Sequence, residues 1–282
     1  MSKPVIITTD STSDLSKELR ERYAIRIVPL QIELGGEIFP DDGRFTAEDL
    51  YRRYHTDGTL PATAAPSPQE YEEVFEPILA EGCEIVHLSI SSELSSSYST
   101  ARIVAQELEG VYTVDTRMLS TGVGLLAIEG AECAQRGMSA ADIAAHLTAL
   151  TAKVETSFVL DTLSFMRKGG RCSGLAAIGA NLMHIKPALA MKDGKLVVYK
   201  KYRGKIEHVY RQYITERLEG KRIRPGHVFL TESGEIAPEE IEELTALVRE
   251  LTGAKEVHHT YAGCTVSTHC GPKTLGVLFI EE

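Results

Sequence analysis

The sequence predicts an α/β protein with two domains: an N-terminal domain built on a parallel sheet and a C-terminal α+β domain with a largely antiparallel sheet. Three observations lead to this prediction. The chain has 282 residues, which is long enough for two hydrophobic cores. Its first half alternates short apolar runs with helical segments, and its second half contains a hairpin signal. We place the boundary near 152–158, which gives domains at 1–155 and 156–282.

In the first half, β-prone runs and helix-compatible segments follow one another. This order implies a parallel sheet covered by helices on both faces. The expected strands lie at 5–7, 25–30, 85–88 and 111–114. The expected helices lie at 14–23, 69–79, 100–108, 124–136 and 140–151. A polar stretch separates the second strand from the helix at 69–79.

In the second half, Asp193-Gly194 stands between the β-prone runs 186–191 and 196–199, which is typical of a two-residue hairpin turn. Hairpin pairing favours an antiparallel sheet with helices on one side. Further strands are expected at 228–231, 256–260, 266–269 and 277–280, and helices at 206–218 and 238–251.

Composition is that of an ordinary globular protein apart from the absence of Trp. The sequence opens without a charged segment followed by an apolar one, and no apolar run approaches bilayer length, so we expect a cytoplasmic protein without stable membrane insertion. Five scattered cysteines without a Cys-x-x-Cys pair argue against a disulfide framework and a structural zinc site.

Charge divides unevenly along the chain. Residues 1–155 carry 12 Lys and Arg against 25 Asp and Glu, whereas residues 156–282 carry 18 against 15. Most of the positive charge in the second half lies between Lys186 and Arg224. A solvated face is the usual interpretation of such a run, and docking to an acidic partner is the alternative. The acidic whole and the lack of a recognition motif exclude nucleic acid as an expected partner.

Serines gather between Ser91 and Ser97, directly after the apolar run at 85–88 and before a helical segment. Hydroxyls at the start of a helix are well placed to hold an anion, because the first N–H groups lack partners within the helix. Helix capping and turn formation are the alternative.

Two acidic residues and three hydroxyls follow the first strand in Asp10-Ser11-Thr12-Ser13-Asp14. They could bind metal or phosphate, because open α/β sheets bind ligands at this edge. Capping by Ser13 or Asp14 is the favoured interpretation. Two other segments carry a polar group in a special setting. Thr63 lies in a Pro-rich linker, and Arg171 follows two glycines that a helix stop would explain.

Several segments partly match known motifs but lack a residue or a spacing that the motif requires. Gly122-x-Gly124-x-x-Ala127 lacks the acidic residue that a dinucleotide site needs, and Gly271-Pro272-Lys273-Thr274 lacks the first glycine of a phosphate loop. His258 and His259 are adjacent in a strand and therefore point to opposite faces, so with His269 and the nearby Cys264 and Cys270 they are not expected to bind metal. No Gly-x-Ser-x-Gly elbow is present.

Taken in order, the remaining motifs resemble the DegV family, the fatty-acid-binding subunits often called FakB. The match spans essentially the whole chain. The matching segments are Asp10-Ser11-Thr12-Ser13-Asp14-Leu15, Thr63-x-x-Pro66-Ser67, Leu88 to Tyr98, Lys168-Gly169-Gly170-Arg171, Ile178 to Pro187 and His269-x-Gly271-Pro272-x-x-x-Gly276.

The resemblance implies a protein that holds one long-chain fatty acid in a tunnel between two domains and needs no cofactor or metal. It implies that Thr63 and Ser95 hydrogen-bond the carboxylate, with His269 in the same network. It associates Arg171 and Arg203 with the headgroup region and with kinase docking. Members are not catalysts; a separate ATP-dependent fatty acid kinase converts the presented acid to an acyl phosphate for phospholipid synthesis. The small residues at 174–180 would suit a lid or tunnel wall.

Some residues depart from the family pattern. Ala64-Ala65 stand where Ser-Gln is usual, and Ser96 and Lys273 replace glycines. These changes bear on the backbone shape near the carboxylate. An alternative function remains open at this point: an α/β enzyme acting on a small carboxylate or phosphate with Asp10, Asp14, Ser95 and His269. A nicotinamide-dependent enzyme is a distant third.

Overall fold

The computed structural model describes residues 3–172 and 185–282. The described residues divide between two compact units, those within 1–44 and 62–152 forming one and those within 45–61 and 153–282 the other. The chain passes into the second unit for the last time at 152/153, a few residues before the expected boundary at 155/156. We keep that boundary as a domain prediction. The segment 45–61, which belongs to the second unit, is an excursion that the sequence did not indicate.

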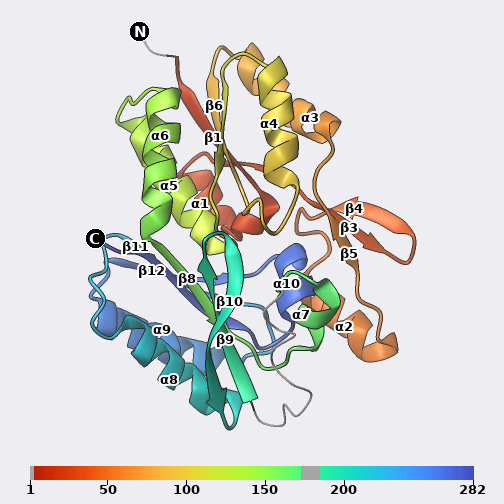
Figure 1. The fold of residues 1–282 in the computed structure, drawn as a ribbon, viewed down its shortest axis with the longest axis vertical. Coiled ribbons are helices and arrows are strands. Elements are labelled where there is room, and N and C mark those ends of the chain that lie inside the picture. Colours follow the sequence, from red (N-terminus) through yellow and green to blue (C-terminus); the bar gives the residue numbers. More distant parts are fainter. Residues whose placement is uncertain (1–2, 173–184) are drawn as a thin grey trace. The chain divides into compact units, whose positions relative to one another are not determined.

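The first unit is built on a four-stranded parallel sheet in the order β2-β1-β6-β7. Its strands are β1 (Val5–Asp10), β2 (Arg26–Val28), β6 (Glu84–Ser89) and β7 (Val111–Asp115). Helices α3 (Pro68–Ala80) and α4 (Ser97–Glu107) cover one face, and α5 (Thr121–Gln135) and α6 (Ala140–Leu150) cover the other (Figure 1). This confirms the doubly covered parallel sheet. The predicted helix at 14–23 begins later, as α1 (Lys17–Arg22), after a 3-10 turn at Ser11–Ser13.

A small antiparallel sheet of order β4-β3-β5 also belongs to the first unit. It comprises β3 (Gln31–Leu34), β4 (Glu37–Pro40) and β5 (Ala62–Ala64). Gly35 and Gly36 join β3 to β4 with positive φ values of 65° and 85°, the conformation that a tight hairpin requires and glycine permits. The sequence analysis treated this region only as a polar stretch.

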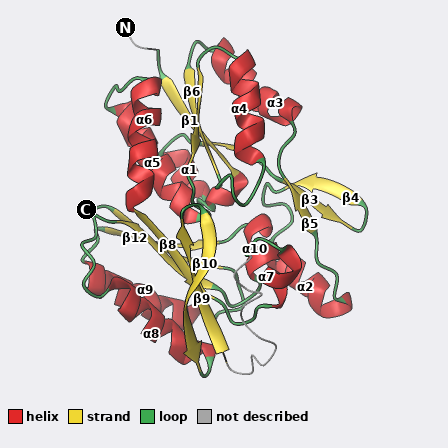
Figure 2. Ribbon diagram, viewed as in Figure 1, coloured by secondary structure: helices red, strands yellow, loops and turns green. Residues whose placement is uncertain are grey.

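The second unit is built on a six-stranded mixed sheet, whose strands are yellow in Figure 2. The order of the strands is β10-β9-β8-β13-β11-β12. Its strands are β8 (Val154–Val159), β9 (Ile185–Lys192), β10 (Lys195–Arg203), β11 (His227–Glu232), β12 (Glu256–Tyr261) and β13 (Leu275–Ile280). All pairs are antiparallel except β11 with β12, which is parallel because α9 (Pro238–Thr252) connects them in a βαβ unit. Asp193 and Gly194 have positive φ at the predicted β9–β10 turn.

Helix α8 (Ile206–Leu218) packs with α9 on one face of this sheet, as expected. Their apolar residues share a core with Val228, Leu230 and Val257. Two short helices contact one another: α7 (Ser164–Gly169), whose end the sequence indicated as a helix stop, and α10 (Cys264–Cys270), which was missed. The strand predicted at 266–269 was wrong, because this segment is α10.

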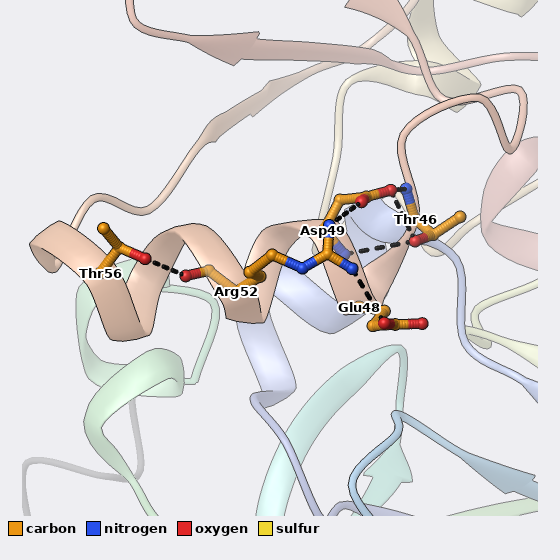
Figure 3. Close-up of polar contacts among 5 residues, drawn as sticks. All are labelled: Thr46, Glu48, Asp49, Arg52 and Thr56. Carbon is orange, nitrogen blue, oxygen red and sulfur yellow. Dashed lines mark hydrogen bonds and ion pairs between the residues drawn. The ribbon is translucent and has the colours of Figure 1, made fainter.

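Helix α2 (Ala47–Asp57) begins at a capping box formed by Thr46 and Asp49 (Figure 3). The Thr46 hydroxyl accepts from the Asp49 N–H at 3.3 Å, and the Asp49 carboxylate accepts from the Thr46 N–H at 3.1 Å. Arg52 reaches both Glu48 and Asp49 at 2.9 Å on the exposed face. These local bonds fix where the helix begins.

All five cysteines lie in the described part of the chain, and each is a free thiol. Across 3–172 and 185–282, no helix combines the length and apolar character that crossing a bilayer requires.

Candidate functional site

Ser95 lies in the turn between β6 and α4. The turn is closed by Leu94 and Ser95, whose N–H groups donate to the Ser91 carbonyl at 2.9 and 3.2 Å. The Ser95 hydroxyl accepts from the Ser97 N–H at 3.2 Å and lies 2.8 Å from the Ser97 hydroxyl. Ser96 is the N-cap residue but makes no side-chain cap bond. The alternative role of these serines in capping is therefore met at the start of α4 by Ser95 itself.

Tyr71 of α3 stabilises this turn through a hydrogen bond from its hydroxyl group. Its side chain is fully buried, and its hydroxyl donates to the Ser97 carbonyl at 3.1 Å. His87 packs edge-on against the Tyr71 ring and lies 2.9 Å from the Thr8 hydroxyl. Burial lowers the pKa of His87 to about 3, so this imidazole is neutral at pH 7. The sequence analysis missed Tyr71, because nothing in its local pattern separates it from an ordinary core aromatic.

Thr63 is the middle residue of β5, where it pairs with Ile32 of β3. It is partly exposed, between two exposed alanines. A few residues later Ser67 and Glu70 form a capping box that begins α3. Gln31 of β3 also donates to the Glu70 carboxylate, so the start of α3 is held to the strand that pairs with β5. Thr63 and Ser95 therefore both belong to the first unit, on elements that lead into α3 and α4.

Asp10 and Asp14 have structural partners in the first unit. Asp10 ends β1, and its carboxylate accepts from the Ile90 N–H at 2.8 Å and from the Thr12 N–H at 3.2 Å. It thus joins the ends of β1 and β6, the two strands between which the chain reverses its direction across the sheet. Burial raises its pKa to about 6, against the lowering effect of these hydrogen bonds.

Asp14 ends the 3-10 turn in a left-handed conformation and accepts from the Ser120 hydroxyl at 2.6 Å. The prediction that Ser13 or Asp14 caps the helix was wrong, because Ser16 is the N-cap of α1. Asp10 and Asp14 instead cap the two ends of the 3-10 turn. With these partners engaged, the two carboxylates do not favour the enzyme alternative.

His269 lies in the second unit, on α10, against the end of α7. A Cβ at Gly169 would overlap the His269 Nδ1 atom, so only glycine leaves room for the imidazole there. A Cβ at Gly271 would lie 2.7 Å from the Phe165 Cδ2 atom. The helix stop after α7 is confirmed at Gly170, which is left-handed and donates to the Met166 carbonyl at 3.2 Å. Gly169, by contrast, is required by a contact that is remote in sequence.

The imidazole of His269 is neutral at pH 7. Burial, and secondarily the charge of Arg171, lower its pKa to about 4. Arg171 is exposed, and its guanidinium donates to the Gly169 carbonyl at 2.7 Å. The structure thus brings together Gly169, Arg171 and His269, three of the residues in the family motifs.

Arg203 ends β10, an outer strand of the six-stranded sheet, and its side chain is exposed. Other basic residues of the Lys186 to Arg224 run occupy the same hairpin. Lys186 is an exception to simple exposure, because its ammonium group pairs with the Asp161 carboxylate at 2.5 Å.

The departures from the family pattern leave an ordinary backbone at Ser96 and an unusual one at Lys273. Ser96 has φ −78° and ψ 0°, which any residue adopts. Lys273 has φ 56°, a conformation that favours glycine. The possible lid at 174–180 and most of the segment 178–187 lie outside the described residues. Gly122 and Gly124 lie inside α5, where a Cβ at Gly124 would meet Leu15 at 2.8 Å. Gly124 therefore allows the close approach of α5 to the segment that follows the 3-10 turn.

Together these features define a class: a two-unit α/β protein with a parallel-sheet unit that carries Thr63 and Ser95 and a mixed-sheet unit that carries His269. A family model described as uncharacterised proteins of the DegV family matches residues 4–282. The chain belongs to the DegV family.

Relatives in this family match the chain over nearly its full length. A DegV domain-containing protein of Deinococcus radiodurans is 31% identical over 281 residues, covering 97% of both chains. One of Caldanaerobacter subterraneus is 28% identical over 285 residues, covering 99% of both.

Solved structures agree with this fold. A DegV family protein of Thermus thermophilus, described as binding fatty acid, matches with a TM-score of 0.88 and 30% identity, covering 100% of both chains. DegV of Bacillus subtilis, described as a fatty acid binding protein, matches with a TM-score of 0.84 and 25% identity, again covering 100% of both.

Proposed function

We propose that this protein binds one long-chain fatty acid and presents its carboxylate to a separate ATP-dependent fatty acid kinase. The observation that carries the proposal is the full-length similarity, in fold and sequence, to the Thermus thermophilus protein described as binding fatty acid. The kinase would transfer a phosphoryl group from ATP to the carboxylate oxygen, giving ADP and an acyl phosphate for phospholipid synthesis. Free thiols agree with a reducing, cytoplasmic location.

We assign the carboxylate to Thr63 and Ser95 of the first unit and His269 of the second. All three are uncharged at pH 7, His269 because its pKa is lowered to about 4. Neutral donors hold a carboxylate more weakly than an arginine fork does, which leaves its oxygen able to accept a phosphoryl group. Arg171, beside His269, and Arg203, exposed on β10, are assigned to the headgroup region and to kinase docking respectively.

The acyl chain would supply most of the affinity. Burying a methylene group contributes about 0.8 kcal/mol, so a long chain outweighs a headgroup whose neutral hydrogen bonds contribute about 1 kcal/mol each. Binding and acyl transfer should therefore respond differently to the same headgroup substitution.

The first experiment is denaturing extraction of the purified, untagged protein followed by mass spectrometry. We expect a long-chain fatty acid in roughly equimolar amount, and its mass gives the chain length and saturation. If no acid co-purifies, and delipidated protein does not bind added acid, the proposal is wrong.

Ser95→Ala tests the headgroup assignment against Ser96→Ala, the adjacent serine that makes no side-chain cap bond. We expect Ser95→Ala to lower acyl phosphate formation by a purified fatty acid kinase more than it lowers fatty acid affinity. Because Ser95 also supplies the α4 cap, it should cost about 1 kcal/mol of stability. Thermal unfolding of both variants measures this part separately.

Ser96→Ala should leave binding, transfer and stability near those of the parent protein. If Ser95→Ala abolished binding while the protein remained folded, or if both serines behaved alike, the assignment of the carboxylate to Ser95 would fail.

A further inference from the structure

Three metal-ligating side chains of the second unit converge where β11 and β12 run parallel. The Nδ1 atom of His227 lies 2.8 Å from the Nε2 atom of His258. An oxygen of Glu256 lies 3.9 Å from the first nitrogen and 3.6 Å from the second. Neither family motifs nor the fatty acid proposal uses these residues.

Strand register produces this grouping. His227 is the partner of Glu256 across the parallel pair, and His258 follows Glu256 by two positions, so all three share one face. The opposite face carries Val228 and Val257, which pack under α8 and α9. The side chains of His227, Glu256 and His258 are 12%, 34% and 16% exposed, so water and ions reach the group. Strand β12 is an outer strand of the sheet.

We propose that His227, Glu256 and His258 bind one divalent transition metal ion of the zinc class. Ligand atoms of a tetrahedral zinc ion, at about 2.0 to 2.1 Å from the metal, lie about 3.3 Å from one another. The three observed separations of 2.8, 3.6 and 3.9 Å bracket this value. Two imidazoles and one carboxylate form a ligand set that zinc uses, and they leave a fourth position for water or another ligand.

Metal binding would require the two imidazole rings to move apart. Their centroids are 5.1 Å apart and their planes differ by 22°, so the two nitrogens face one another as in a hydrogen bond. A metal ion would replace the hydrogen that they share, and the nitrogens would separate by about 0.5 Å as each ring turns toward the carboxylate. The partial exposure of all three side chains allows this rotation.

A second cluster of possible metal ligands, in the first unit, is a weaker candidate for a metal site. Glu129, Cys133 and His146 also approach one another, with Glu129 and His146 at 2.9 Å. However, the Arg136 guanidinium lies 3.1 Å from the Cys133 sulfur and 3.6 Å from the Glu129 carboxylate. The Arg136 cation therefore already lies against two of the three candidate ligands of this cluster.

His259 provides a matched control on the same strand. It is adjacent to His258 but points to the other face, where its Nε2 atom lies 3.1 Å from the Glu232 carboxylate. The expectation that His258 and His259 point to opposite faces of the strand is confirmed. The sequence pattern did not reveal that His258 meets a histidine from the neighbouring strand.

The test uses the untagged full chain, dialysed against a chelator and then titrated with Co²⁺, whose visible absorption reports a nitrogen and oxygen site. We expect one Co²⁺ per chain, displaced by Zn²⁺. His258→Asn and His227→Asn should each weaken Co²⁺ binding by at least about tenfold, the effect that even outer-shell partners have on metal affinity. His259→Asn should leave it unchanged.

Circular dichroism and metal-free thermal unfolding confirm that each variant is folded before it is titrated. A variant that does not fold is replaced by Glu256→Gln, a substitution of similar shape that removes the carboxylate ligand. The proposal is overturned if the parent chain binds no Co²⁺ at micromolar concentration. It is equally overturned if His259→Asn weakens binding as much as His258→Asn, because binding then does not depend on the face that carries the group.

Discussion

The turn before α4 and the contact between α7 and α10 present polar groups by opposite means. In the first unit, Ser95 is held by hydrogen bonds to residues no more than four positions away, with Tyr71 as a longer-range brace. In the second unit, the imidazole of His269 fits against α7 because Gly169, one hundred positions earlier, has no side chain. The first arrangement is made by bonds that a local sequence can specify. The second is made by space that two separate segments must leave for one another.

This difference predicts how each site fails. A hydrogen-bonded turn loses one contact when one partner is removed, and the loss is about 1 kcal/mol. A packed contact that depends on glycine fails when atoms are added, because the neighbour must move. The site in the second unit should therefore be the more sensitive of the two to small substitutions.

Gly169→Ala should have the largest effect. The added methyl group would occupy the place of the His269 imidazole, and we expect a loss of about 1–3 kcal/mol of stability despite the better helix propensity of alanine. Thermal unfolding measures the loss, and NMR titration should show the displaced His269 with a pKa nearer its ordinary value.

Gly170→Asn is the matched control for Gly169→Ala. Gly170 has φ 68° and open space around its Cα, and asparagine tolerates this conformation, so the change should stay within about 1 kcal/mol. Equal destabilisation by both variants would show that helix termination, rather than the contact with His269, explains the pair of glycines.

Tyr71→Phe should have a smaller effect that is confined to the first unit. It removes the hydrogen bond to the Ser97 carbonyl, which should cost about 1 kcal/mol and lower acyl transfer through the loosened Ser95 turn. Tyr210→Phe is its counterpart in the second unit, where the hydroxyl donates to the Lys273 carbonyl at 2.8 Å. It should cost similar stability; a similar loss of acyl transfer in Tyr210→Phe would contradict the role given to Tyr71.

Arg171→Gln should have the smallest effect, a rise in the pKa of His269. Burial is the larger cause of its lowered pKa, so the value should rise from about 4 but remain below the ordinary 6.5. A pKa that stays in place when Arg171 is replaced would mean that the guanidinium is too well solvated to act on the imidazole. The measurement is an NMR titration of the histidine ring signals.

The lowered pKa of His269 also makes the stability of the fold depend on pH. Between pH 6.5 and about 4 the unfolded chain protonates this histidine and the folded chain does not, so stability falls as pH falls. His87, with a pKa of about 3, acts in the same direction. Asp10, raised from 3.8 to about 6, opposes them, because its folded form binds the proton more readily. His269→Gln should therefore flatten the acid limb of a plot of unfolding free energy against pH.

Sequence patterns predicted the first unit well because its elements are long and regular. The alternation of strands and helices from β6 to α6 needs only local propensity and a repeating order. The region between β2 and α3 was missed, although two signals were present in it. Gly35-Gly36 marks a hairpin turn, and Thr46-x-x-Asp49 has the spacing of a capping box.

Helix α10 could not be predicted in this way. Three of its residues, Thr265, Val266 and Thr268, are β-branched, which by propensity favours a strand. The segment is helical in a setting where its neighbours α2 and α7 contact it, and Gly271 ends it with φ 78°. The residues that depend on this contact, Gly169 above all, have a role that appears only once the two helices are paired. The family resemblance pointed to them without supplying the reason.

The position of β13 bears on how the second unit is assembled during synthesis. This strand follows all others of the sheet in the sequence, yet it lies between β8 and β11. Until β13 is synthesised, no strand joins the partial sheet of β8, β9 and β10 to the β11–α9–β12 unit. The Tyr213 hydroxyl, which accepts from the Val277 N–H and donates to the Ser157 carbonyl, can complete its bonds only then. The second unit should therefore close late and cooperatively, and a nascent chain stalled before Leu275 should expose the edges of both partial sheets to chaperones and proteases.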